Sequence, residues 1–76
     1  MHELVKYLVE AIVDVPEAVR VTTRQRGPTT VYEVEVAQED LGKVIGRHGR
    51  TAEALRVVVG TAAQQQGEQA TVDILS

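Results

Sequence analysis

The sequence has no cysteine, tryptophan or phenylalanine, and only two prolines among its 76 residues. Without cysteine there can be no disulfide framework, no thiol nucleophile and no thiolate-bound metal. The two histidines, His2 and His48, lie too far apart in the chain to indicate a local metal-binding pair. No nucleophile–base pair is evident either. We therefore expect no metal, no cofactor and no enzymatic activity.

Long apolar segments are also missing, since no uninterrupted apolar run exceeds three residues. A chain of this kind cannot form a transmembrane helix. Glu3, Lys6 and Glu10 interrupt the apolar stretch that a signal peptide would need. We therefore expect a cytoplasmic protein that makes no contact with membranes.

Positive charge is in the minority, with 8 Lys and Arg against 11 Asp and Glu, for a net charge of −3. This excludes the uniformly basic class of nucleic-acid-binding proteins, so any such binding must come from a local patch. An apolar fraction of 43% and a charged fraction of 25% are typical of a globular domain. The length predicts a single domain over residues 1–76. Its small, aromatic-poor core favours stabilisation by a partner subunit.

Hydrophobic periodicity in the first half of the chain predicts a helix followed by a hairpin. Residues 3–13 carry apolar side chains on one helical face, and the helix should end before Pro16. Alternating patterns over 18–24 and 30–37 predict two strands, which the Gly-Pro turn between them should pair antiparallel. On their shared outer face, basic residues should oppose acidic ones, Arg20 and Arg24 against Glu33 and Glu35.

The second half predicts two helices and a last strand. A short apolar helix opens at residues 38–40, glycines interrupt it at 46–49, and a longer helix follows over 50–65. The run Val57–Val59 is also compatible with a strand, but the period of 3.6 in the wider window favours a helix. The alternation over 70–75 predicts the final strand. The residues expected on the core side of the longer helix are Ala52, Leu55, Val58, Val59 and Ala62.

The resulting order is αββααβ. About thirty residues with two helices separate the second strand from the third, and a connection of that length is a crossover between parallel strands. The sequence thus predicts an α+β domain, with a three-stranded mixed sheet and helices packed on one face. We expect Tyr7 and Tyr32 at the edge of its core.

Positive charge gathers around a Gly-x-x-Gly motif, Gly46 to Gly49. Residues 43–56 hold four basic residues and one acidic residue, or +3, whereas the rest of the chain holds four basic and ten acidic residues, or −6. Glycine lets the backbone approach another chain closely, and the N-terminus of the following helix attracts phosphate. The basic residues of this segment are Lys43, Arg47, Arg50 and Arg56. The pattern predicts a site for a phosphodiester backbone.

The segment Val44-Ile45-Gly46-Arg47-His48-Gly49-Arg50 resembles the I-G-x-x-G signature of KH domains, and the order αββααβ is similar to the type II KH arrangement. With its flanking residues, the chain resembles along its whole length the small bacterial RNA-binding proteins of the KhpA (YlqC) family. In KH domains the loop clamps the backbone of single-stranded RNA. That role would fall here on Gly46, Arg47, His48 and Gly49.

The resemblance further implies a cytoplasmic post-transcriptional regulator or RNA chaperone. It also implies self-association and pairing with a second KH protein, KhpB (also called Jag). Because no aromatic residue lies near the loop, the bases would rest in an aliphatic groove floored by Val44, Ile45 and Leu55 rather than stack on rings.

Plainer interpretations stay open. The glycines could form a simple turn between helices, and the basic side chains, with His48, could be ordinary surface groups. A KH-shaped protein–protein interaction module with little or no RNA binding is therefore the alternative function, and the acidic net charge of −3 favours it.

Helix geometry suggests where a second copy would bind. At about 100° per residue, small and apolar side chains fall on the outer face of the helix over 50–65, at Ala54, Val57 and Thr61. A purely solvated face usually carries more charge. We expect a two-fold homodimer through this face, which would also be available to a second KH protein.

Overall fold

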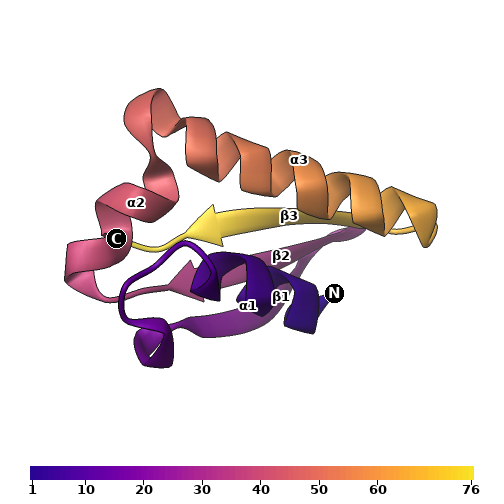
Figure 1. Cartoon of the computed structure of the whole chain (residues 1–76). Helices are drawn as coiled ribbons and strands as arrows, with labels where there is room; N and C mark the ends of the chain where they lie inside the picture. Colours follow the sequence, from indigo (N-terminus) through magenta and orange to yellow (C-terminus); the bar gives the residue numbers. More distant parts are fainter.

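Three helices and three strands follow one another in the predicted order αββααβ (Figure 1). The computed structural model describes all 76 residues. The elements are α1 (His2–Glu10), β1 (Arg20–Arg26), β2 (Thr29–Glu35), α2 (Leu41–Ile45), α3 (Arg50–Gln65) and β3 (Gln69–Ile74). Short 3₁₀ turns precede β1, α2 and α3, namely η1 (Pro16–Ala18), η2 (Gln38–Asp40) and η3 (Arg47–Gly49).

α1 ends at Glu10, three residues before the predicted boundary. At its end the hydrogen bonds tighten, since the Ile12 N–H donates to the Val9 carbonyl at 3.0 Å, three residues back. Ile12 still packs against the core beyond the end of the helix. The stretch Val57–Val59 lies within α3, so the helical prediction for it is confirmed.

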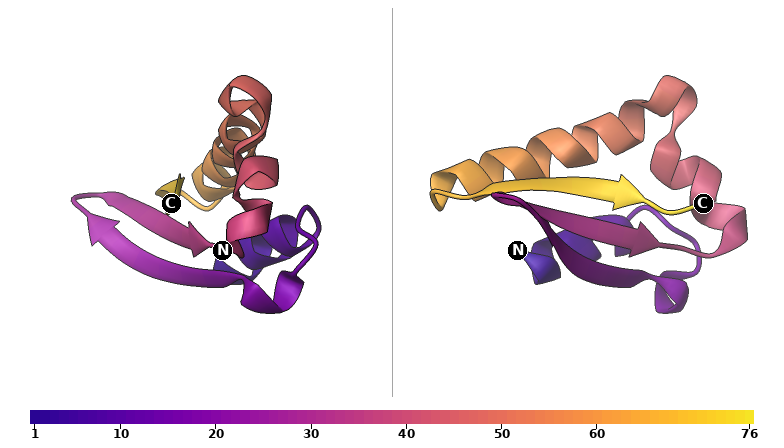
Figure 2. Two further views of the ribbon diagram at one scale, coloured as in Figure 1. Left: turned by 90° about the vertical axis from the view of Figure 1, so that its left-hand side faces the viewer. Right: turned by 180° about the vertical axis from the view of Figure 1, so that it is seen from behind.

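The three strands form one mixed sheet in the order β1-β2-β3. β1 and β2 are antiparallel, and β2 and β3 are parallel, as the crossover predicts. The expected charge pairing on the outer face is confirmed, because Arg20 lies opposite Glu35 and the Arg24 Nε is 2.7 Å from the Glu33 carboxylate. The helices cover the other face of the sheet (Figure 2).

Valine builds most of the core between the sheet and the helices. Nine buried residues form one cluster, Val5, Val9, Val19, Tyr32, Val34, Val44, Leu55, Val59 and Val72. Tyr32 is thus a core residue. Tyr7, by contrast, is 70% exposed, so the prediction that it lies at the core edge is wrong; it falls on the face of α1 opposite the buried Val5 and Val9.

α3 is rotated slightly from the predicted orientation. Its buried residues are Ala52, Leu55, Val59 and Ala63. Val58 is 46% exposed, so its assignment to the core side is wrong, and the buried Ala63 replaces the half-buried Ala62. Residues four apart follow one another along a helix face, and Val59 and Ala63 continue the line that Leu55 begins.

Candidate nucleic-acid interface

A tight turn at Gly46 connects α2 to α3. Gly46 adopts φ 79° and ψ 170°, a region of backbone space that is essentially reserved for glycine. A Cβ at this position would lie 2.7 Å from the Cβ of Thr51 and 2.8 Å from its backbone nitrogen. Both the backbone angles and the packing therefore require glycine at position 46.

The rest of the loop is held in a tight turn by left-handed backbone angles and one hydrogen bond. His48 (φ 57°) and Gly49 (φ 74°) both adopt the left-handed conformation, and the Gly49 N–H donates to the Gly46 carbonyl at 3.1 Å. Space around Gly49 is open, so only its backbone angle favours glycine. His48 holds a conformation that costs a residue with a Cβ roughly 1–2 kcal/mol, and its side chain is exposed at the tip.

Free positive charge surrounds this turn. Arg47 and Arg50 are exposed, and neither has a carboxylate within ion-pairing distance. The turn leads directly into the 16-residue α3, whose first turn has no side-chain cap. The N–H groups at the start of α3, the positive end of its dipole and the two guanidinium groups thus meet at one corner of the molecule.

Lys43 was predicted to join the basic residues around the glycine turn, but its ammonium group pairs with carboxylates instead. Its ammonium forms an ion pair with Asp14 and lies 3.5 Å from the Asp40 carboxylate. The hydrogen bond to Asp14 raises the pKa of Lys43 more than partial burial lowers it. The charge of Lys43 is therefore compensated by carboxylates from its own chain.

Asp40 is the residue that sequence reasoning missed. It is fully buried, and its carboxylate accepts the backbone N–H groups of Asp14 at 3.1 Å and Val15 at 3.0 Å. Burial by itself would raise the pKa of Asp40, but these two N–H groups and the Lys43 ammonium lower it below its ordinary value. These hydrogen bonds from Asp14 and Val15 to Asp40 link the loop after α1 to the start of α2. Acidic residues at the start of a helix suit the positive end of its dipole, but nothing in the sequence indicates that the Asp40 carboxylate binds the backbone N–H groups of Asp14 and Val15.

Arg56 lies two turns along α3 and faces the sheet. Its Nε donates to the Val72 carbonyl of β3 at 3.0 Å, and its Nη1 is 3.5 Å from Glu53. Ile45, the last residue of α2, is 38% exposed beside the loop. The structure therefore brings Gly46, Arg47, His48, Gly49, Arg50 and Ile45 together, and it separates Lys43 and Arg56 from them by their own contacts.

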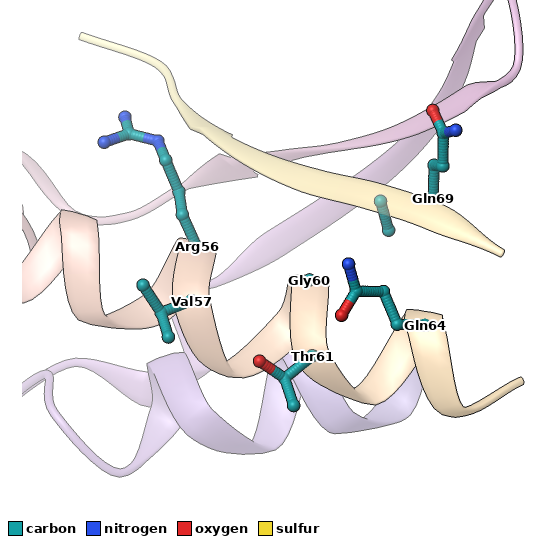
Figure 3. A pocket seen from close by; sticks show the side chains of 7 residues that line it. Arg56, Val57, Gly60, Thr61, Gln64 and Gln69 are labelled. Atoms are coloured by element: carbon teal, nitrogen blue, oxygen red, sulfur yellow. The ribbon is translucent and has the colours of Figure 1, made fainter. Parts of the chain in front are cut away.

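A groove of about 340 Å³ runs between α3 and β3 (Figure 3). Arg56 and Gln64 reach from α3 toward the strand, whereas Val57 and Thr61 lie on the outer rim. The other lining residues are Gly60, Gln69 and Ala70. The predicted groove floor is wrong in part, because Val44 and Leu55 are buried in the core. The groove that exists is lined by both polar and apolar groups and lies farther along α3.

The outer face of α3 carries the side chains that were expected to bind a second copy. Ala54 and Thr61 are exposed, and Val57 is 58% exposed. Val58 adds a second valine to this surface.

No helix is long and apolar enough to span a lipid bilayer.

Comparison with known proteins supports the KH resemblance. The family model described as "KhpA/KhpB, KH domain" matches residues 2–74. The RNA-binding protein KhpA of Caldanaerobacter subterraneus subsp. tengcongensis is 43% identical over 75 residues, which cover 99% of this chain and 100% of the relative. That of Halalkalibacterium halodurans is 44% identical over 75 residues, 99% of each chain.

A third relative has a higher identity over a shorter segment. The RNA-binding protein KhpA of Streptomyces coelicolor is 53% identical over 60 residues, covering 79% of this chain and 76% of the relative. The family match extends over nearly all of the chain, and the observed αββααβ order is consistent with a KH domain. The chain therefore belongs to the KhpA/KhpB family of KH-domain proteins.

Proposed function

We propose that this protein binds single-stranded RNA by holding the sugar–phosphate backbone against the loop Gly46–Gly49. The observation that carries the proposal is the set of unpaired cations at this turn. Arg47 and Arg50 have no carboxylate partner, although the chain as a whole carries −3. Arginine matches phosphate oxygens with its fork of N–H donors, and the glycine backbone permits close approach.

The groove between α3 and β3 offers a path for the nucleotides that follow. Arg56, Gln64 and Gln69 present polar groups along it, and amide and guanidinium groups can hydrogen-bond to base edges. No aromatic side chain lines the groove, so the bases would be held by polar contacts and by the aliphatic side chain of Ile45 beside the loop instead of by ring stacking. The main hold is on the sugar–phosphate backbone, which is the same for every sequence, so binding would tolerate different base sequences.

A double variant of the loop tests the proposal. Arg47→Asp/His48→Asp places two negative charges where phosphates would approach, so binding to oligouridine should become undetectable while the circular dichroism spectrum stays unchanged. Wild-type affinity should also fall as the salt concentration rises. A plot of the logarithm of the association constant against the logarithm of the salt concentration should have a slope of about −1.5 to −2, as expected for two or three phosphate contacts on a single strand. Affinity of the double variant within twofold of wild type at low salt would refute the clamp.

In cells, such binding suits a post-transcriptional regulator or RNA chaperone that acts in the cytoplasm. The protein carries no further site whose chemistry suggests catalysis, and no cluster of three or more His, Asp or Glu could hold a metal ion. RNA binding without strong base selection would let one small protein contact many transcripts.

We also propose a two-fold homodimer through the outer face of α3, at Ala54, Val57 and Thr61, with Val58 beside them. Two exposed valines on adjacent positions of one helix support it, because they would lose contact with water in a helix–helix contact. The same face is available to a second KH protein such as KhpB. If oligouridine fails to bind while self-association persists, the alternative function, a KH-shaped protein–protein interaction module, replaces the RNA clamp.

A further inference from the structure

β1 is an edge strand whose outer side has no partner. It pairs only with β2, and all five residues from Thr22 to Arg26 are exposed, on both faces of the sheet. Exposed edges of this kind can accept another extended chain.

Hydrogen bonds identify the free backbone groups. The His2 Nε2 is 2.9 Å from the Val21 carbonyl, so this carbonyl points away from β2. The carbonyl of Val34, the residue opposite, accepts the Leu75 N–H at 2.9 Å and thus also points away from the β1–β2 ladder. Because hydrogen-bonded and non-bonded pairs alternate in antiparallel strands, the N–H and C=O groups of Thr23 and Gln25 point outward as well.

His2 occupies one end of this edge. With the Val21 carbonyl capped by His2, the open stretch runs from Thr23 to Arg26. An incoming strand could form backbone hydrogen bonds with the N–H and C=O groups of Thr23 and Gln25. Its alternate side chains would then lie beside Arg24 and Arg26, on the face of the sheet that the helices leave uncovered.

Charge selects the partner. β1 contains three arginines, Arg20, Arg24 and Arg26, and no acidic residue. Pairing of β1 with the β1 of a second copy would bring arginines together, which is unfavourable. Arg26 has no carboxylate within ion-pairing distance, and Arg24 uses its Nε for Glu33 while its terminal nitrogens stay available. Carboxylates at alternate positions of an added strand would complement both.

A polyanionic nucleic acid fits this face less well. Glu33 and Glu35 of β2 and Asp73 of β3 lie on the same face as the arginines, in register with one another. They would repel phosphates that cross the face, whereas a strand added at the outer edge is separated from them by β1. We propose that the free edge from Thr23 to Arg26 binds an extended acidic peptide segment of a partner protein by strand addition, independently of the RNA loop.

A synthetic peptide tests this inference on the full chain. The probe is a fluorescein-labelled peptide of about ten residues in which Glu alternates with Thr, and the matched control has Lys in place of every Glu. Fluorescence anisotropy should show at least tenfold tighter binding of the Glu peptide. Its binding should slow hydrogen exchange at the amides of Thr23 and Gln25 more than elsewhere in the chain. Equal affinity for both peptides, no binding, or protection confined to another segment would overturn the proposal.

Variants separate the edge from the loop. Arg26→Glu should weaken peptide binding at least tenfold, and Arg26→Lys should retain it within about threefold. Gln25→Pro removes one edge N–H and should also weaken binding; if it fails to fold, the Arg26 pair decides alone. The loop variant Arg47→Asp/His48→Asp should bind the peptide like wild type. Loss of peptide binding in the loop variant would show that the peptide binds at the RNA loop. Loss of oligouridine binding in Arg26→Glu would show that RNA binds at the β1 edge. Either result would refute strand addition.

Discussion

The side chain of Thr51 fills the space that any side chain at Gly46 would need, since a Cβ at Gly46 would lie 2.7 Å from the Thr51 Cβ. Packing against the first turn of α3 thereby determines the backbone conformation at the end of α2. Gly49, at the other end of the motif, has no atom within 4 Å of the position where its Cβ would lie. The two glycines of one motif are thus required for different reasons.

Alanine substitutions should show this difference in stability. Gly49→Ala incurs only the left-handed backbone angle, so it should lower the free energy of unfolding by roughly 1–2 kcal/mol. Gly46→Ala adds the overlap with Thr51, whose backbone cannot move without shifting α3, so we expect a loss of about 3 kcal/mol or more. Urea denaturation of both variants measures the two values. Equal losses would show that the turn relaxes around a side chain at position 46.

The buried carboxylate of Asp40 should make stability depend on pH. Its pKa in the folded protein lies below the ordinary value of 3.8, so its contribution is present at neutral pH and is lost as the pH falls through the lowered pKa. Asp40→Asn should therefore have a lower Tm than wild type at pH 7, and the gap should narrow below about pH 3.8. Glu39→Gln, an exposed neighbour, is the matched control and should follow wild type. A gap of constant size down to about pH 2.5 would contradict the assignment.

Arg50 and Lys43 should behave in opposite ways, although the sequence placed both in one basic patch. Arg50 is exposed and unpaired, so Arg50→Ala should weaken oligouridine binding about three- to tenfold, close to 1 kcal/mol, and leave the Tm unchanged. Lys43 is paired with Asp14 and Asp40. Lys43→Ala should therefore lower the Tm and change the RNA affinity less than twofold. Comparable losses of RNA affinity in both variants would show that Lys43 also contacts RNA and would contradict this prediction.

Val57 should control self-association. In a two-fold contact each substitution acts twice, so Val57→Glu should give a monomer in sedimentation velocity at tens of micromolar, with unchanged helix content. Gln66→Glu, which adds the same charge at an exposed position beyond the end of α3, should leave the oligomeric state as it is in wild type. If the wild-type chain is itself monomeric at these concentrations, Val57 is merely an exposed valine.

Local sequence patterns predicted most of the fold. The period of 3.6 around Leu55 and Val59, the alternation around Tyr32 and Val34, and the length between β2 and β3 determine the element types and the parallel pairing, because each reflects burial of one face or the reach of the chain. The prediction for Val58 failed because neighbouring helical positions differ by 100°. A small rotation of α3 therefore exchanges a buried residue for an exposed one.

For the candidate site, the sequence by itself determined the glycine turn, the clustering of basic residues around it and the helix that follows. These are properties of adjacent residues and need no knowledge of distant partners. Only the tertiary structure decided which cations are free. Lys43 meets Asp14, 29 residues away, and Arg56 meets Val72, 16 residues away, whereas Arg47 and Arg50 meet no carboxylate. An ion pair or a side-chain-to-backbone hydrogen bond depends on distance in space, and the positions of the two partners in the sequence do not encode that distance.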